Sequence, residues 1–252
     1  MTAVFKREFK SYFTSPLGYV FLSIFFFFEG SFFVYLFGMG SPAVELIFPS
    51  MGYVIFLVTP VITMRLLSED RKQKVDQALL TAPVSVGGIV MGKFLSAFAV
   101  FALALSPNLL FQIIAAMLSD GVNWLVFLNA LLGALLVGAA LIAIGMFISS
   151  LTESTIISCI LTLVCNLLLM ILPSFVSMLS TDLSFGGIEW LEKAVGAVIS
   201  FIVAASDKIA LNSLLSAFAG SVFHIVDVIY LLSIVAVFVF VSIRAVERRR
   251  WA

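Results

Sequence analysis

The sequence is poor in charged residues, and this shortage decides its class first. Asp, Glu, Lys and Arg make up 11% of the 252 residues, whereas an average soluble domain has about 25%. Hydrophobic residues make up 62% and include 26 phenylalanines. A water-facing globular fold would have too few polar side chains to cover its surface. The composition therefore predicts an integral membrane protein.

Three further shortages exclude other classes. The 14 Lys and Arg are balanced by 14 Asp and Glu, which argues against a nucleic-acid binder because such a protein needs a basic excess. His224 is the single histidine, which excludes multi-histidine metal sites. Cys159 and Cys165 lie six residues apart in one apolar run. A helix turns them to different faces, so we interpret them as small buried hydrophobes.

Long apolar runs take the place of the missing polar residues. A membrane span needs roughly 20 predominantly apolar residues, and six stretches meet this requirement. The sequence predicts a single all-α membrane domain over residues 1–252, with spans at 16–37, 46–67, 86–119, 121–150, 154–180 and 226–246. Residues 181–225 are interpreted as a helical segment at or in the outer surface. A pair of extra spans or a re-entrant hairpin is the rival interpretation.

The distribution of Lys and Arg predicts the orientation. With six spans and the N-terminus in the cytoplasm, the C-terminus is cytoplasmic too. The outer face then carries only Lys193 and Lys208, and all other basic residues lie inside. The inner set comprises Lys6, Arg7, Lys10, Arg65, Arg71, Lys72, Lys74, Lys93, Arg244, Arg248, Arg249 and Arg250.

Residues 1–15 are expected to form an amphipathic helix that lies in the membrane interface. Its aromatic side includes Phe5 and Phe9, and the neighbouring arc carries Lys6, Arg7 and Lys10. The helix is an anchor in the simplest interpretation. In the alternative, it is an elbow that links the first span to the cytoplasmic side.

The most polar passage, residues 68–85, lies between the second and third predicted spans. Ser68 is the expected N-cap of a short helix, acids occupy its first turn, and Pro83 ends it. The residues that we expect to matter are Glu69, Asp70, Arg71, Lys72, Val75, Asp76, Leu79, Leu80 and Pro83. A solvated loop is the simplest interpretation. A capped helix with an apolar stripe also fits a segment that docks onto a partner.

Three passages resemble ABC-2 type transporter permeases, close to the gliding-motility subgroup. They are the opening Phe5–Tyr19, the loop Arg65–Leu95 with Leu79-Leu80-Thr81-Ala82-Pro83-Val84-Ser85, and the ending Asp227–Trp251. The middle of the chain is matched by hydrophobic pattern alone. In the loop the family usually has Gly-Thr-x-Glu, whereas this chain has Lys74-Val75-Asp76-Gln77, so the acid is displaced by one position.

The resemblance implies a transport subunit rather than an enzyme. Two ATP-binding subunits would bind ATP and Mg²⁺, and one of them would grip the 68–85 coupling segment. A second permease, identical or related, would complete an export-like transporter in a bacterial plasma membrane. The chain itself has no catalytic, metal or cofactor site in this interpretation, because Gly87 to Lys93 matches only part of a phosphate loop and Phe94 stands where Ser or Thr is needed.

A few polar residues interrupt the apolar runs. An ionised Glu29 in the middle of the first span costs about 2.5–3.5 kcal/mol, so it faces protein or water, or is protonated. Asn108, Gln112 and Asn166 are its candidate partners or line the same seam. A functional and a structural role are equally compatible with this pattern. Two other functions stay open: an ion-coupled secondary transporter that uses Glu29, and a multipass enzyme that acts on lipid.

Prolines and small residues predict the shape of the spans. Pro60, Pro107 and Pro173 each lie inside a predicted span and are expected to kink it. Small residues in the fourth predicted span are expected to let a neighbouring helix approach closely. They are Gly133, Ala134, Gly138, Ala139, Ala143 and Gly145.

Overall fold

The structure is a computed structural model that describes residues 1–41, 43–72, 85–119, 121–182, 211–220 and 225–250, and the regular elements in these ranges are all helices. Within this part of the chain, five segments are long and apolar enough to cross a membrane. They are Pro16–Gly38, Gly52–Lys72, Val86–Leu118, Trp124–Leu151 and Ile225–Arg248. The prediction of an all-helical fold is therefore confirmed, and five candidate spans are found among the described residues where six spans were predicted.

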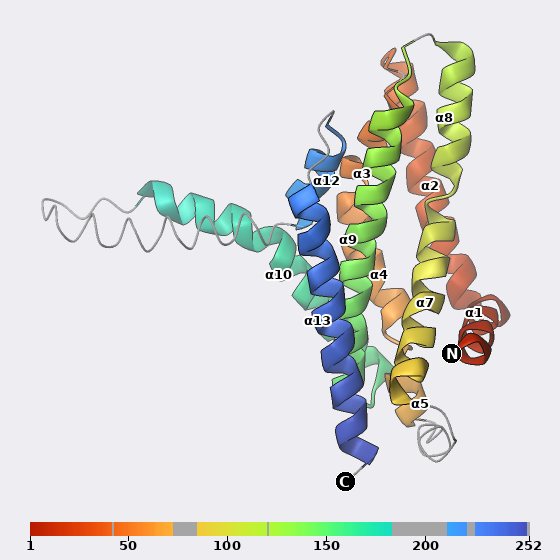
Figure 1. Ribbon diagram of the computed structural model, residues 1–252. Helices are drawn as coiled ribbons and strands as arrows, with labels where there is room; N and C mark the ends of the chain where they lie inside the picture. Colours follow the sequence, from red (N-terminus) through yellow and green to blue (C-terminus); the bar gives the residue numbers. More distant parts are fainter. Residues whose placement is uncertain (42, 73–84, 120, 183–210, 221–224, 251–252) are drawn as a thin grey trace, which may run out of the picture.

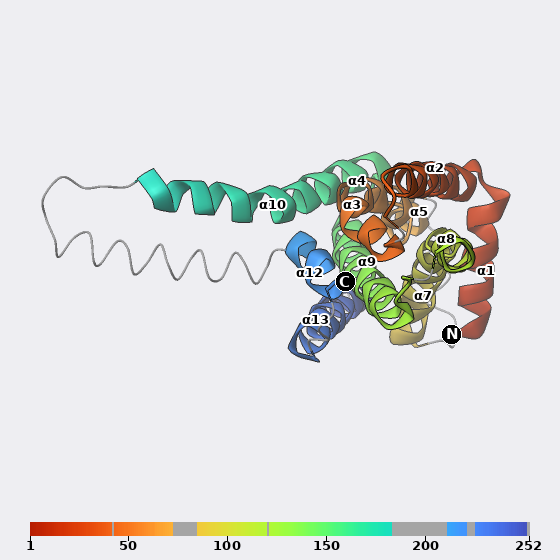
Figure 2. The ribbon, with the colours of Figure 1, turned by 90° about the horizontal axis from the view of Figure 1, so that it is seen from above.

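The first helix, α1 (Thr2–Thr14), lies across one end of the bundle, and α2 (Pro16–Gly38) runs along the bundle from there (Figures 1 and 2). Pro16 opens α2, where its missing N–H costs no helix hydrogen bond. The corner between the helices is tight, because a Cβ atom on Gly18 would lie 2.4 Å from the carbonyl oxygen of Tyr12. The expected interfacial helix at residues 1–15 is thus present as a helix.

A central helix, α9 (Trp124–Leu151), holds the bundle together by packing against α4, α7, α10, α12 and α13. Its small residues make this possible, as predicted. A Cβ on Gly138 would lie 2.0 Å from Cε1 of Phe101, and one on Gly145 would lie 2.4 Å from Oγ1 of Thr63. Asn123 caps the helix by accepting hydrogen bonds from the N–H groups of Leu125 and Val126.

The second predicted span is built from several pieces. Its first part consists of η1 (Val44–Leu46) and α3 (Ile47–Ser50), and α4 (Gly52–Thr63) follows. A turn then leads into α5 (Ser68–Lys72). Residues 46–67 are therefore not one continuous helix.

The third predicted span is also broken. It consists of α7 (Val86–Ala104) and α8 (Pro107–Leu118). The break at Leu105 and Ser106 directly precedes Pro107, which lacks the N–H that would continue the hydrogen-bond ladder. The kink expected at this proline is present as an interruption of the helix.

The fifth predicted span, 154–180, corresponds to α10 (Thr155–Asp182). This helix packs against α4 and α9, and its far part projects from the side of the bundle (Figures 1 and 2). Its apolar stretch with described side chains covers Thr155–Ile171. Pro173 lies beyond that stretch, in the part of α10 whose side chains are not described.

The chain returns to the bundle through α12 (Leu211–Phe218) and α13 (Ile225–Arg250). Most of the segment 181–225, which was expected to lie at the outer surface, is outside the described residues. The N-terminus, α5 and the end of α13 lie toward the same end of the bundle (Figure 1). This arrangement is compatible with the predicted topology, in which both termini and the 68–85 segment share one side of the membrane.

Candidate functional site

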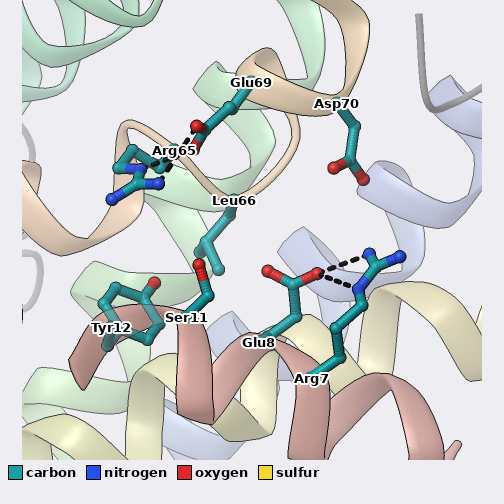
Figure 3. A pocket seen from close by; sticks show the side chains of 8 residues that line it. All are labelled: Arg7, Glu8, Ser11, Tyr12, Arg65, Leu66, Glu69 and Asp70. Carbon is teal, nitrogen blue, oxygen red and sulfur yellow. Dashed lines mark hydrogen bonds and ion pairs between the residues drawn. The ribbon is translucent and has the colours of Figure 1, made fainter. Parts of the chain in front are cut away.

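Charged side chains gather where α1, the end of α4, α5 and the start of α7 meet. We call this group the ionic junction; it comprises Arg7, Glu8, Arg65, Glu69, Asp70 and Lys93. A pocket of about 250 Å³ opens between these helices, lined by five of the six residues together with Ser11, Tyr12 and Leu66. Figure 3 shows Arg7 and Glu8 on α1 facing the residues of the α4–α5 turn across this pocket.

Lys93 is the buried centre of the junction. Its side chain is 1% exposed, and its Nζ lies 2.8 Å from Oδ2 of Asp70 and 3.2 Å from Oε1 of Glu8. One ammonium group therefore joins α7 to α5 and to α1. A buried cation needs such partners, because removing it from water is costly unless carboxylates and hydrogen bonds compensate. The first turn of α7 is also capped, since Ser85 Oγ accepts a hydrogen bond from the N–H of Gly88.

The carboxylate of Glu8 forms ion pairs with two basic side chains, Lys93 and Arg7. Besides Lys93, the guanidinium of Arg7 donates to Oε1 of Glu8, with Nη2 at 2.6 Å. Burial acts to raise the pKa of Glu8, but the attraction of Lys93 and the hydrogen bond from Arg7 outweigh it, so the pKa is held below its ordinary value. Glu8 is therefore a carboxylate at neutral pH.

The turn between α4 and α5 is bonded to its neighbours on three sides. Tyr12 Oη donates to the carbonyl of Ile62 at 3.0 Å, one of the last carbonyls of α4, which has no partner within its own helix. Arg65 donates to Ser15 Oγ at 2.9 Å and to Oε1 of Glu69 at 3.0 Å. Burial raises the pKa of Tyr12, so its hydroxyl remains a donor.

The third side of this turn is held by α9. Ser149 Oγ accepts hydrogen bonds from the N–H groups of Leu67 at 3.1 Å and Ser68 at 3.0 Å. Its hydroxyl also donates to the carbonyl of Met64 at 3.2 Å. As a result α5, the start of the predicted coupling segment, is fastened to α1, α7 and α9.

Only the beginning of the predicted coupling segment is described. Asp70 and Glu69 belong to the ionic junction, Arg71 forms an ion pair with Glu153 in the turn between α9 and α10, and Lys72 is exposed. Ser68 does not act as an N-cap, because its hydroxyl donates to the carbonyl of Met64. Val75, Asp76, Leu79, Leu80 and Pro83 lie outside the described residues.

The residues predicted to anchor α1 in the membrane interface lie in different surroundings: the aromatic residues pack together, and the two lysines are exposed. The rings of Phe5 and Phe9 stack with centroids 5.8 Å apart, and Phe9 packs against the apolar core. Lys6 and Lys10 are exposed. Arg7, which was predicted as an anchor, joins the ionic junction through Glu8.

The intramembrane polar residues divide into two groups. Asn108 Nδ2 donates to Oε1 of Glu29 at 2.7 Å, and Gln112 lies one turn further along α8, fully buried. Asn166, by contrast, does not bond to Glu29. Its Nδ2 donates to the carbonyl of Phe56 at 2.9 Å, the acceptor that Pro60 leaves without its usual helix donor.

Sequence reasoning missed most of the ionic junction. Lys93 stands out as the single formal charge between residues 86 and 119, and this signal was available, but its partners on α1 and α5 were not. Glu8, Tyr12 and Ser149 gave no signal of their own. Among the described residues, no group of three or more His, Cys, Asp and Glu side chains comes together as a metal site.

Comparison with known families now identifies the class. Residues 41–194 match the model of a family described as ABC-2 family transporter protein. This range covers more than half of the chain, so the chain belongs to that family and is a multi-pass membrane permease. Permeases of this family typically have no catalytic activity of their own and generally pair with ATP-binding subunits. A comparison with the curated proteins gave no significant match.

Proposed function

We propose that the chain is the membrane subunit of an ATP-driven exporter of the gliding-motility type, located in a bacterial plasma membrane with both termini in the cytoplasm. Two separate ATP-binding subunits bind ATP and Mg²⁺, and a second permease, identical or related, completes the transporter. The segment 68–85 is the coupling segment that one ATP-binding subunit grips. The resemblance of both chain ends and of the loop to that subgroup supports this assignment.

The observation that carries the proposal is the fastening of α5 to the rest of the bundle. A pull on residues 73–85 acts directly on α5, which immediately precedes them, and on α7, which begins at Val86. From Asp70 the force passes through Lys93 to α7 and on to Glu8 and α1. From the backbone of Leu67 and Ser68 it passes through Ser149 to α9. Movement of the ATP-binding subunit is thereby converted into movement of the spans.

A second contact with the ATP-binding subunit is expected beside the first. Glu153, with a side chain that is 76% exposed, lies in the turn between α9 and α10 and pairs with Arg71 of α5. This turn and the coupling segment are therefore neighbours. A partner that grips the coupling segment would also touch the turn, and would press on α9 and α10 directly.

The test is copurification with an ATP-binding subunit, which this proposal expects to be encoded beside the chain. The double variant Leu79→Asp/Leu80→Asp should insert normally and lose the partner. Leu79 belongs to the predicted apolar stripe and Leu80 is next to it in the sequence, and carboxylates at these two positions oppose docking. Thr2→Asp is the control, since it adds an acid at an exposed position of α1, and it should retain the partner. Full retention of the partner by the double variant would contradict the docking assignment.

The same preparation distinguishes the two remaining functions. An ion-coupled secondary transporter would move substrate as an isolated chain under a proton or sodium gradient, without any ATP-binding subunit. A lipid-modifying enzyme would change lipid chemistry in the absence of ATP. Either activity in the isolated chain would overturn the proposal.

A further inference from the structure

A second polar site lies inside the membrane-spanning part, between α2 and α8. Glu29, Asn108 and Gln112 are each fully buried. Within the described protein, four of their polar atoms have no hydrogen-bond partner: Oε2 of Glu29, Oδ1 of Asn108, and Oε1 and Nε2 of Gln112. Buried polar atoms are nearly always satisfied, so a group of four indicates a missing ligand.

The orientation of the Asn108 amide is fixed by its own contacts. Nδ2 donates to Oε1 of Glu29 at 2.7 Å and to the carbonyl of Leu105 at 3.2 Å. Both N–H donors are therefore used, and Oδ1 must be the atom that is left free. Gln112 follows Asn108 by four residues on α8, which places the two amides on the same helix face.

The site stands at the break in the third span. Leu105 and Ser106 separate α7 from α8, and Asn108 lies in the first turn of α8. Helix breaks within a membrane are tolerated where they face protein or a cavity. A ligand held by Glu29 and Asn108 would fasten α2 to the first turn of α8, directly after the break.

The charge of Glu29 has no basic partner among the described residues. On the elements packed against α2, neither α3 nor α8 carries a titratable side chain. Arg7 and Glu8 of α1, Lys93 on α7 and Arg65 after α4 belong to the ionic junction. The two other charges of α1, Lys6 and Lys10, are exposed. Glu29 lies 13 residues after Pro16, about 20 Å along α2 from that end. Glu45 on η1, which packs against α8, is itself acidic.

The unpaired atoms define the chemistry of the ligand. Three of them are oxygens, one from a carboxylate and two from carboxamides, and such hard oxygens bind hydrated protons or alkali and alkaline-earth cations. A single positive charge cancels the charge of Glu29, whereas a divalent cation would leave an excess charge in an apolar region. We propose that Glu29, Asn108 and Gln112 bind one monovalent cation, either Na⁺ or a hydronium ion. Its occupancy locks α2 to α8.

The experiment measures the unfolding temperature of the purified full-length chain in detergent. In the first arm Na⁺ is replaced by N-methyl-D-glucamine at constant pH and ionic strength. In the second arm the pH is varied without Na⁺. The wild type should be stabilised in a saturable way in one arm, and the responding arm identifies the cation. Glu29→Gln should abolish this response, because it removes the charge and keeps the shape.

Two further variants keep the test decisive. Gln112→Leu retains Glu29 and removes one oxygen ligand, so it should shift the half-saturating cation concentration at least tenfold. Glu45→Gln removes a carboxylate outside the site and should respond as the wild type does. The proposal is overturned if the wild type responds in neither arm beyond the Glu29→Gln baseline, or if Gln112→Leu responds at the wild-type concentration.

Discussion

Replacing Lys93 with methionine tests the ionic junction most directly. Methionine keeps the apolar stem of the side chain and removes the ammonium group that joins Asp70 to Glu8. Losing one partner of a fully buried ion pair costs about 3–5 kcal/mol. Here the two carboxylates are 17% and 16% exposed, and Glu8 keeps Arg7, so we expect a loss of about 2–3 kcal/mol.

Equilibrium unfolding of the purified chain in mixed micelles gives the free energy for this comparison. Lys6→Met is the matched control, because Lys6 is exposed on α1, and it should change stability by no more than about 0.5 kcal/mol. The double variant Lys93→Met/Asp70→Asn removes both members of the closest pair. Its loss should fall short of the sum of the single losses by about 1 kcal/mol or more.

The functional consequence is separate from stability. Spin labels at Lys10 and Lys72 report the distance between α1 and α5 in the complex with the ATP-binding subunit. In the wild type the distribution of distances between the two labels should stay narrow in the ATP and ADP states, since the junction holds the helices together. In Lys93→Met this distribution should broaden while the ATP-binding subunit remains bound. A stability loss below about 0.5 kcal/mol, or strictly additive losses in the double variant, would refute the assigned role of Lys93.

Three more variants probe other parts of the fold. The pKa of Glu8 is lowered from its ordinary value of 4.5, so Glu8 contributes stability that is present above about pH 4.5 and is lost as the pH falls through the lowered pKa. The unfolding midpoint of the wild type should therefore fall more steeply in acid than that of Glu8→Gln. Asn166→Leu should cost about 0.5–2 kcal/mol by leaving the buried carbonyl of Phe56 unpaired. The same substitution should cost less in a Pro60→Ala background, because alanine restores the helix N–H that pairs with this carbonyl. Gly138→Ala should cost about 1–3 kcal/mol through the clash with Phe101, and Phe101→Leu should recover part of it. The last two predictions are read out by the free energy of unfolding.

The spans were predictable because crossing a bilayer requires a long apolar run, and that requirement is local in the sequence. The close approach at Gly138 and the interruption before Pro107 were predictable for the same reason: both follow from the chemistry of one residue. Asn108, one of the three candidate partners of Glu29, donates to it. The candidates could be named because intramembrane polar groups are few and tend to bond one another.

The ionic junction was not predictable from local pattern. Glu8 and Lys93 are 85 positions apart, and they meet only because α1 lies across the end of the bundle against α7. The role of Asn166 was missed for a related reason. Pro60 indicates that the carbonyl of Phe56 needs a donor, but the packing of α10 against α4 decides which amide supplies it.

The chemistry of the junction suits a lever better than apolar packing would. Dispersion contacts are weak individually and not directional, so no single one of them ties a helix to a particular atom of its neighbour. The ammonium of Lys93 and the hydroxyl of Ser149 instead bond particular atoms of α5, α1 and the α4–α5 turn. Displacing α5 without its neighbours would leave these buried groups unpaired. The helices joined by these bonds, α1, α5, α7 and α9, must therefore move as one body. The rearrangement that this motion requires then falls on the apolar contacts elsewhere in the bundle.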